Sequence, residues 1–363
     1  MKLRISGHII KAKIELFSSL LKSKGNDSYS EFVRLSVVDN ALTLQYTNGS
    51  VGFTAKIYDI LASESCSFLL NAELFWKFIK SHTEDLEIEV KETHEVDIKY
   101  ANGIFTTPWY DDVYPLFFEA PKENIVLKSS YFVPVLKRAF AFITKNEFSE
   151  TINRIFVNVL HDRIDVVSTD TFKLFKSTKK FDSKGHTFSF KISTDACGVL
   201  YTAAKNKDID VVISSDDRRV YLSFEDVDLY ELKTEDKFPN YQRVYDAFSM
   251  SYSMRIEKTV LLKSLERICS LSNSQNLDIC MADKMIIKLE DIMTSNKVME
   301  DVHCIDYDGE PAILRVDKDN FLPSVKCVLG NKILIMYSKE RRCLMIFGTE
   351  FSDDKIICSV ISN

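Results

Sequence analysis

The chain has 363 residues, a formal net charge of −6 and 45% apolar residues. This length exceeds what a single hydrophobic core usually supports, so two or three domains are expected. The composition is that of a globular protein, and no apolar stretch approaches the roughly 20 residues of a bilayer-spanning helix, which excludes fibrous, disordered and membrane-spanning classes. The strand-like start at Met1 to Ser6 lacks an export signal, so we expect a cytoplasmic location and no membrane contact.

In chain order, six segments have the apolar spacing of helices. They cover residues 8–24, 71–82, 129–146, 193–207, 257–272 and 317–330. An alternating strand pattern follows every second helix, at 86–90, 209–213 and 332–336, and another strand follows each of these after a short polar turn. These helices begin 122 and then 124 residues apart, which indicates an internal repeat.

Two of the repeats end on an aromatic residue followed by proline, at Phe238 and Pro239 and, 124 residues earlier, at Tyr114 and Pro115. We therefore expect an α+β chain of three tandem domains, each with two helices packed on antiparallel sheets. The expected boundaries are 1–120, 121–248 and 249–363.

Charge is distributed unevenly along this pattern. The six helices contain 16 Lys and Arg but only 7 Asp and Glu, a balance of +9 in a chain whose total is −6. Basic helices on an acidic protein fit contact with a phosphate backbone, without recognition of base sequence. Alternatively, Lys and Arg are good helix formers that decorate solvated faces. The threefold repeat favours the first interpretation.

Motifs for chemistry are absent from the sequence. It has no phosphate-binding glycine loop and no nucleophile motif, and its adjacent carboxylates, such as Asp216 and Asp217, lie in polar turn-like stretches. The eight cysteines never form a Cys-x-x-Cys pair, and His303 beside Cys304 is the one close His/Cys pairing. We expect free thiols, no metal, no cofactor and no catalytic residue.

Three stretches of the chain carry a resemblance to a known family. They are 168–174 (Ser-Thr-Asp-Thr-Phe-Lys-Leu), 237–244 (Lys-Phe-Pro-Asn-Tyr-Gln-Arg-Val) and 265–273 (Leu-Glu-Arg-Ile-Cys-Ser-Leu-Ser-Asn). Along its whole length the chain resembles the bacterial DNA polymerase III beta subunit, the DNA sliding clamp. The resemblance implies a non-enzymatic ring, formed by two chains head to tail, that encircles double-stranded DNA. Such a ring tethers polymerase, clamp-loader and repair proteins through their short hydrophobic motifs.

The resemblance also implies three sets of site residues. The partner-peptide pocket would comprise Val157, Thr169, Thr171, Phe172, Lys173, Leu174, Pro239, Arg243, Val244, Cys343, Cys358 and Val360. The DNA-facing set would be Lys22, Lys24, Lys137, Arg138, Arg154, Lys205, Lys263, Arg267 and Lys326. The dimer interface would join Leu74, Phe78 and Ile104 of the first domain to Ser270 and Leu271 of the third.

Several positions depart from the family pattern. Thr171 and Phe172 replace a usual Gly-His, and Cys358, Ser359 and Val360 replace a usual Met-Pro-Met, so we expect a pocket with altered partner preference. Ser270 stands where the family tends to be apolar, which would weaken the dimer contact.

Two alternatives stay open at this point. One is a scaffold of the same fold that does not encircle DNA. The other is a hydrolase or nucleic-acid-modifying enzyme built on duplicated domains.

Overall fold

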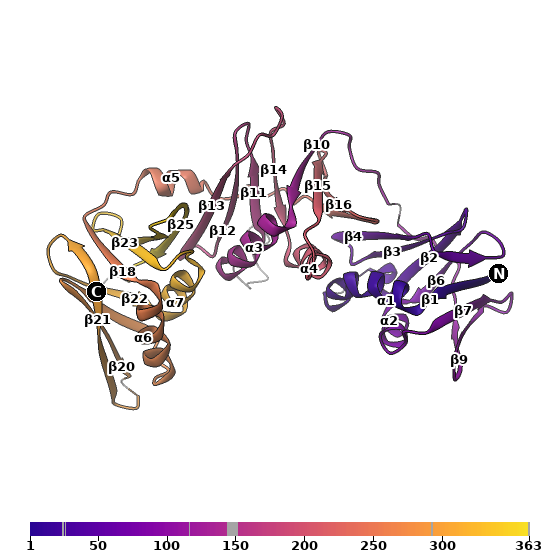
Figure 1. Ribbon diagram of the computed structural model, residues 1–363, viewed down its shortest axis with the longest axis horizontal. Coiled ribbons are helices and arrows are strands. Elements are labelled where there is room, and N and C mark those ends of the chain that lie inside the picture. The colour runs from indigo at the N-terminus through magenta and orange to yellow at the C-terminus, as the bar shows by residue number, and fades with distance from the viewer. Residues whose placement is uncertain (24, 26, 116, 144–151, 292, 362–363) are drawn as a thin grey trace. The chain divides into compact units, whose positions relative to one another are not determined.

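A computed structural model describes the chain except for residues 24, 26, 116, 144–151, 292 and 362–363 (Figure 1). The described residues divide by their contacts into two compact units. Unit 1 consists of Met1–Pro134 and Ile192–Thr234, and unit 2 of Val135–Lys191 and Glu235–Asn363. Each unit is built of antiparallel sheet with helices packed against it.

Unit 1 contains two sheets. The first has the order β5-β1-β7-β8-β9, formed by Ile60–Ala62, Lys2–Ser6, Asp85–Val90, Glu95–Tyr100 and Gly103–Pro108. The second has the order β10-β15-β16-β17-β4-β3-β2-β6, formed by Asn124–Lys128, Asp210–Ser215, Arg219–Phe224, Val227–Leu232, Val51–Ile57, Ala41–Thr47, Phe32–Val38 and Cys66–Asn71.

Unit 2 is organised around one continuous run of twelve strands. Its order is β14-β11-β12-β13-β25-β24-β23-β18-β21-β20-β19-β22. The strands are Phe188–Ile192, Ile155–Val159, Arg163–Thr169, Lys173–Lys180, Phe351–Ser359, Cys343–Gly348, Lys332–Ser338, Tyr252–Glu257, Asn296–Asp308, Lys284–Asp291, Asn276–Met281 and Ala312–Asp317.

The six expected helices are present, most of them shorter than expected. They are α1 (Gly7–Leu16, continued by the 3-10 helix η1, Phe17–Lys22), α2 (Ala72–Lys80), α3 (Ser129–Ala139, followed by η3, Phe140–Phe142), α4 (Thr194–Ala203), α6 (Lys258–Ser270) and α7 (Lys318–Cys327). Two further short helices, η2 (Ser28–Glu31) and α5 (Tyr241–Asp246), were not expected. Lys24 and the end of the segment expected at 129–146 lie outside the described residues.

The second helix of each repeat begins at a side-chain cap. Asn71 accepts a hydrogen bond from the main-chain N–H of Leu74, and Ser193 accepts one from Ala196. Asp317 does the same for α7 by accepting from two main-chain N–H groups. Because such caps satisfy N–H groups that the first turn leaves unpaired, they fix where each helix starts. The cap therefore recurs with the repeat.

The strand connections repeat three times as well. The orders β6-β2-β3-β4, β14-β11-β12-β13 and β22-β19-β20-β21 are equivalent, and so are β1-β7-β8-β9, β10-β15-β16-β17 and β18-β23-β24-β25. Consecutive repeats are joined by equivalent pairings, β17 with β4 inside unit 1 and β25 with β13 inside unit 2. The topology confirms the expected α+β repeat. The two compact units divide the middle repeat between them.

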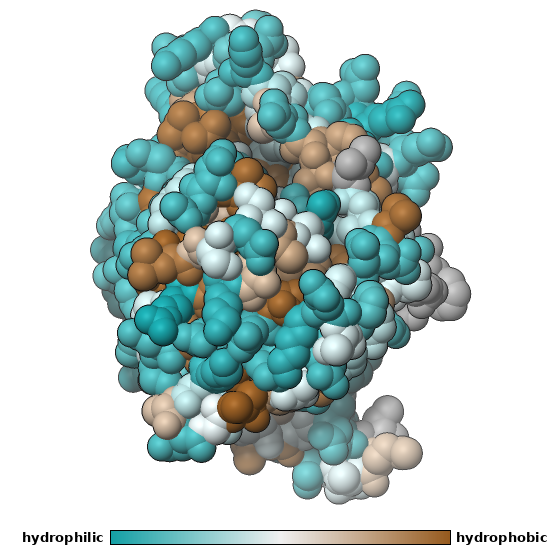
Figure 2. All heavy atoms as spheres, turned by 90° about the vertical axis from the view of Figure 1, so that its right-hand side faces the viewer, coloured by the Kyte–Doolittle hydropathy of each residue, from teal (hydrophilic) through white to brown (hydrophobic). Residues whose placement is uncertain are grey.

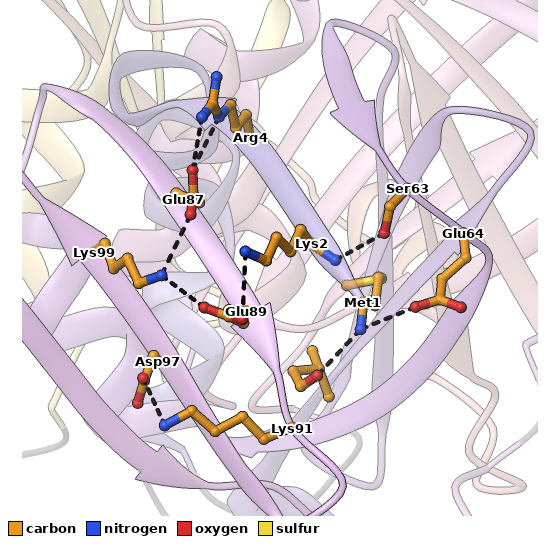
Figure 3. A network of polar contacts seen from close by, with 11 residues as sticks. Met1, Lys2, Arg4, Ser63, Glu64, Glu87, Glu89, Lys91, Asp97 and Lys99 are labelled. Atoms are coloured by element: carbon orange, nitrogen blue, oxygen red, sulfur yellow. Dashed lines mark hydrogen bonds and ion pairs between the residues drawn. The ribbon is translucent and has the colours of Figure 1, made fainter.

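Charged side chains cover one face of β1, β7 and β8 in unit 1 (Figure 3). Glu87 lies 2.9 Å from Arg4 and 3.4 Å from Lys99, and Lys99 also reaches Glu89 at 2.6 Å. Hydrogen bonds from Arg4 and then Lys99 lower the pKa of Glu87 below its usual range. Neighbouring residues such as Ile88 are fully buried, so this sheet has one solvated face and one core face.

Candidate functional site

An apolar hollow of about 510 Å³ lies in unit 2, between α5 and strands β13, β24 and β25. It is lined by Thr169, Thr171, Phe172, Lys173, Leu174, Phe238, Pro239, Asn240, Tyr241, Arg243, Val244, Ala247, Arg341, Arg342, Cys343, Ile357 and Ser359. In Figure 1, α5 lies on the side of these strands away from α6 and α7. The hollow therefore occupies the face of the sheet that those two helices leave open.

The floor of the hollow forms where two strands of different repeats pair. Leu174 on β13 stands opposite Ile357 on β25, and both pack with Val167 and Met345 in one buried cluster. The partly buried ring of Phe238 borders this cluster. Apolar side chains thus remain accessible above a packed core, which is the composition of a site for an apolar ligand.

Helix α5 forms one wall and is held by two tyrosine hydroxyls. Tyr241 donates to the carboxylate of Asp165 over 3.1 Å, and Tyr245 donates to the main-chain oxygen of Lys355 over 3.0 Å. Asp165 is 1% exposed and also accepts a hydrogen bond from Thr178. Burial raises the pKa of Tyr241 to about 12 and that of Tyr245 well above its usual value, so both phenols remain donors. This short helix therefore depends on contacts with the sheet for its position.

The turn between β12 and β13 forms the opposite wall. Thr171 has φ +80, in the left-handed region. Asp170 accepts hydrogen bonds from the N–H groups of Phe172 and Lys173, and its carboxylate lies 2.9 Å from the Lys173 ammonium. These bonds hold the turn in place while the ring of Phe172 stays 63% exposed. The turn therefore presents an aromatic side chain at the edge of the hollow.

Solved structures resemble the whole chain. The DNA polymerase sliding clamp of Bacillus subtilis superposes with a TM-score of 0.92 at 14% identity, over 100% of this chain and 99% of that one. The DNA polymerase III subunit beta of Pseudomonas aeruginosa gives 0.91 at 15% identity over 100% of both chains. That of Thermotoga maritima gives 0.85 at 17%, over 100% of this chain and 99% of that one. The chain has the sliding-clamp fold.

Comparison of sequences alone finds no relative. No protein-family model matches the chain, and no curated protein matches it. The structure thus confirms the expected fold at 14 to 17% sequence identity.

Nine of the twelve pocket residues expected for the clamp fold line the hollow. Val157, Cys358 and Val360 do not. Val157 is fully buried, and so is Cys358, where burial raises the pKa of the thiol to about 12. Its neighbours on β25, Ile357 and Ser359, line the hollow instead, because successive side chains of a strand point to opposite faces.

Other lining residues were missed from the sequence. Tyr241 begins a helix too short to show periodicity, and Ala247 follows the end of that helix. Arg341 and Arg342 lie in the turn after β23. The alternation of side-chain direction along β25 was the one sequence signal for lining residues, since it assigns Ile357 and Ser359 to the same face.

The basic residues expected to face DNA differ in their exposure and in their ion pairs. Lys22, Lys137, Lys205 and Lys263 are exposed, and Arg154 is half-buried. The other three described members have acidic partners, Arg138 with Asp354 at 2.5 Å, Arg267 with Glu300 at 2.6 Å and Lys326 with Glu266 at 3.0 Å. Lys24 lies outside the described residues. Exposed Lys22, Lys205 and Lys263 are therefore the stronger candidates for phosphate contact.

The residues expected at a dimer interface are mostly accessible. Leu74, Ile104 and Leu271 are 50%, 57% and 57% exposed, and Ser270 is exposed as well. Phe78 is half-buried under the ring of Phe105, 4.8 Å away. Figure 2, which looks onto the end of unit 1 that carries β1, β7 and β9, shows hydrophobic side chains in separate patches on a mostly hydrophilic surface.

A second hollow, of about 660 Å³, lies in unit 1 and is more polar. Its charged lining includes Arg4, Glu87 and Lys99, which pair with one another. Since these charges already have partners, the hollow in unit 2 is the better candidate for a ligand.

Within the described part of the chain, no group of three or more His, Cys, Asp or Glu side chains is arranged to hold a metal ion. Among these same residues, every helix is too short or too polar to cross a bilayer.

Proposed function

We propose that this protein is a DNA sliding clamp. Two copies would form a ring around duplex DNA, and the hollow in unit 2 would bind short hydrophobic motifs of polymerase, clamp-loader and repair proteins. The observation that carries the proposal is the agreement in fold along the entire chain, because a ring requires all three repeats. The proposal keeps the domain boundaries 1–120, 121–248 and 249–363, a non-enzymatic role and the cytoplasmic location expected from the sequence.

The strand pairings support closure by a second copy. Each in-chain junction joins the last strand of one repeat to a strand of the preceding repeat, as β17 joins β4 and β25 joins β13. The strands β4 and β13 end the equivalent orders β6-β2-β3-β4 and β14-β11-β12-β13. The strands left over are β9 and β21. Among the described strands, β9 pairs only with β8, and residues 296–303 of β21 pair only with β20. A third junction of the same kind would pair β9 of one chain with β21 of another.

Exposed apolar side chains near these two edges support the same contact. Ile104 lies on β9, and Leu74 lies one turn before Phe78 on α2, whose ring stacks on Phe105 of β9. Leu271 follows α6, which packs on β21. Two such interfaces, related by a twofold axis, would close a ring of six repeats. A ring needs only weak contacts with DNA, because its topology holds it on the duplex, so exposed Lys22, Lys205 and Lys263 suffice for screened phosphate contacts.

The hollow supports the tethering role. Its volume and apolar floor suit one or two large apolar side chains of an extended peptide, and its rim offers polar groups for orientation. The altered turn at Thr171 and Phe172 supports a partner preference that differs from the usual one of the family.

Retention on DNA with blocked ends tests the ring. The protein is threaded onto linear duplex DNA tethered to beads at one end, the free end is then blocked with streptavidin, and the beads are washed at high salt. We expect retention on blocked DNA, loss from unblocked DNA, and release when a restriction enzyme cuts the duplex. Equal retention on blocked and unblocked DNA, or none on either, would contradict encirclement and favour a scaffold of the same fold.

A further inference from the structure

We propose that the hollow in unit 2 selects partner segments in which carboxylates flank the apolar anchor residues. This inference rests on the proposed function of the hollow as a peptide site and specifies the chemistry of the peptide. The basic side chains at the rim of the hollow support this inference, because their charge is complementary to that of carboxylates.

The lining of the hollow is electrostatically one-sided. It contains four basic residues, Lys173, Arg243, Arg341 and Arg342, and no carboxylate. Lys173 is already neutralised, because its ammonium lies 2.9 Å from Asp170 and both side chains are at most 15% exposed. The three arginines remain as the charged groups available to a ligand.

The surroundings of these three arginines allow them to pair with a ligand. All three are exposed, and among the described residues neither Arg243 nor Arg342 has an ion-pair partner. Arg341 pairs with Glu340 at 3.4 Å, but both side chains are more than half exposed, so solvent screens that pair. A guanidinium presents a planar fork of N–H groups that matches a carboxylate, and a ligand that buries the rim would strengthen such pairs.

The rim is also held in position before any ligand binds. The Nε of Arg341 donates to the main-chain oxygen of Ala247, at the end of α5, over 3.2 Å. The main-chain N–H of Arg341 donates to the hydroxyl of Ser338 over 3.3 Å. The turn that carries Arg341 and Arg342 is therefore attached to the helix that carries Arg243. Pre-organised groups bind with a smaller entropic cost.

The apolar floor separates this site from a general anion site. A phosphate backbone would satisfy the arginines but offer no apolar group to the floor at Leu174 and Ile357 or to Val244 on the wall. A peptide with apolar anchors and neighbouring carboxylates satisfies both parts of the hollow. Duplex DNA and acidic peptides without anchors are therefore the competing ligands in the test.

The test measures binding of labelled synthetic peptides to the full chain by fluorescence anisotropy. One peptide has a core of two leucines and a phenylalanine flanked by aspartates, a second has asparagines in place of the aspartates, and a third has the aspartates with glycines in the core. Each has an amidated C-terminus, and a free-acid form of the asparagine peptide tests a terminal carboxylate. We expect the aspartate peptide to bind about tenfold tighter than the asparagine peptide, from two screened ion pairs. The difference should shrink as salt rises from about 0.05 to about 0.5 M.

Variants assign the effect to the rim. In the double variant Arg341→Gln, Arg342→Gln we expect the preference for aspartate to fall to near one, so that the aspartate and asparagine peptides bind this variant about equally. Arg218→Gln is the matched control, because Arg218 is an exposed arginine in the equivalent turn of the middle repeat, in unit 1. It should leave the preference intact. Val244→Asp, which places a carboxylate in the wall, should abolish binding of both anchored peptides.

The outcomes separate this inference from the proposed function. Equal binding of the aspartate and asparagine peptides, both lost in Val244→Asp, would overturn the inference and leave the peptide site standing. Binding of the glycine-core peptide as tight as that of the anchored one, or full competition by short duplex DNA, would also overturn it, because the rim would then bind any anion. Absence of binding by every peptide would contradict the peptide-site part of the proposed function itself.

Discussion

The guanidinium of Arg138 on α3 lies 2.5 Å from the carboxylate of Asp354 on β25, with the two side chains only 16% and 12% exposed. The same guanidinium stacks 5.3 Å from the ring centre of Phe175. Arg138 therefore joins the helix to the strand that forms part of the hollow's floor, and its charge is already compensated. It is better described as a structural residue than as a phosphate contact.

Replacement of Arg138 should accordingly reduce stability. We expect Arg138→Gln to lower the free energy of unfolding by about 2 to 3 kcal/mol, because it leaves Asp354 without its cation in a largely buried place. Urea denaturation followed by circular dichroism measures the change. Lys263→Gln, at an exposed position of α6, is the control and should change stability by less than about 0.5 kcal/mol. Equal effects of the two substitutions would contradict a structural role for Arg138.

Thr171 adopts φ +80 in the turn beside the hollow, a conformation that strains a β-branched residue. We expect Thr171→Gly to raise the free energy of unfolding by about 0.5 to 1 kcal/mol, since relief of strain outweighs the added entropy of the unfolded chain. Thermal unfolding measures this. Thr171→Ala retains a Cβ and should gain less than glycine. A lower melting temperature for the glycine variant would show that the Thr171 side chain contributes more than its backbone costs.

The pair formed by Arg267 on α6 and Glu300 on β21 should make stability depend on pH. Hydrogen bonds from Arg267 and from Ser264 lower the pKa of Glu300 below its ordinary value of 4.5. A carboxyl whose pKa is lower in the folded state stabilises the fold fully above its unfolded pKa, and that contribution is lost as pH falls through the folded pKa. We expect the loss to begin as pH falls below about 5.

Glu300→Gln should remove this pH-dependent contribution to the free energy of unfolding. Compared with wild type, the variant should be less stable at pH 7, and the difference should narrow as pH falls from about 5 to about 3 in urea titrations at each pH. Glu290→Gln, which breaks the exposed pair of Glu290 on β20 with Lys297 on β21, is the control. A difference between wild type and Glu300→Gln that stays constant over this range would rule out the ionised pair as its source.

Assembly should depend on the exposed end of α6. We expect Leu271→Glu to shift the protein from a mass near twice 41.8 kDa to a single chain of 41.8 kDa in light scattering at micromolar concentration. A charged group at the proposed contact would be desolvated without a partner. Val260→Glu, at another exposed apolar position of the same helix, should leave the dimer intact. A single chain in the wild type, or dissociation by both variants, would argue against the interface.

Much of the fold could be predicted from local patterns. Helices capped by Asn71, Ser193 and Asp317 can be located from the sequence, because a capping side chain followed by apolar periodicity is a local signal. The hairpins behind them are equally local. The repeat then follows from spacing alone.

The site residues and contacts that the sequence did not predict depend on features that local patterns do not encode. Cys358 was expected in the hollow, but it is buried and its neighbour Ile357 lines the hollow, because a shift of one residue along a strand moves a side chain to the other face. The pairing of Arg138 with Asp354 spans 216 positions, so nothing near Arg138 in the sequence reveals it. Helix α5 has six residues, too few for a periodic pattern, and it forms because Tyr241 and Tyr245 bond to the sheet.

If β9 of one chain pairs with residues 296–303 of β21 in another, as proposed, these two edges also determine how the assembly grows. A contact between two different surfaces is heterologous, and it closes only if the rotation from one chain to the next completes a full turn. A small change of angle at the in-chain junctions, β17 with β4 or β25 with β13, would turn the same pairing into an open filament. Mutations far from either edge could therefore convert a closed particle of fixed mass into a polymer whose length rises with concentration.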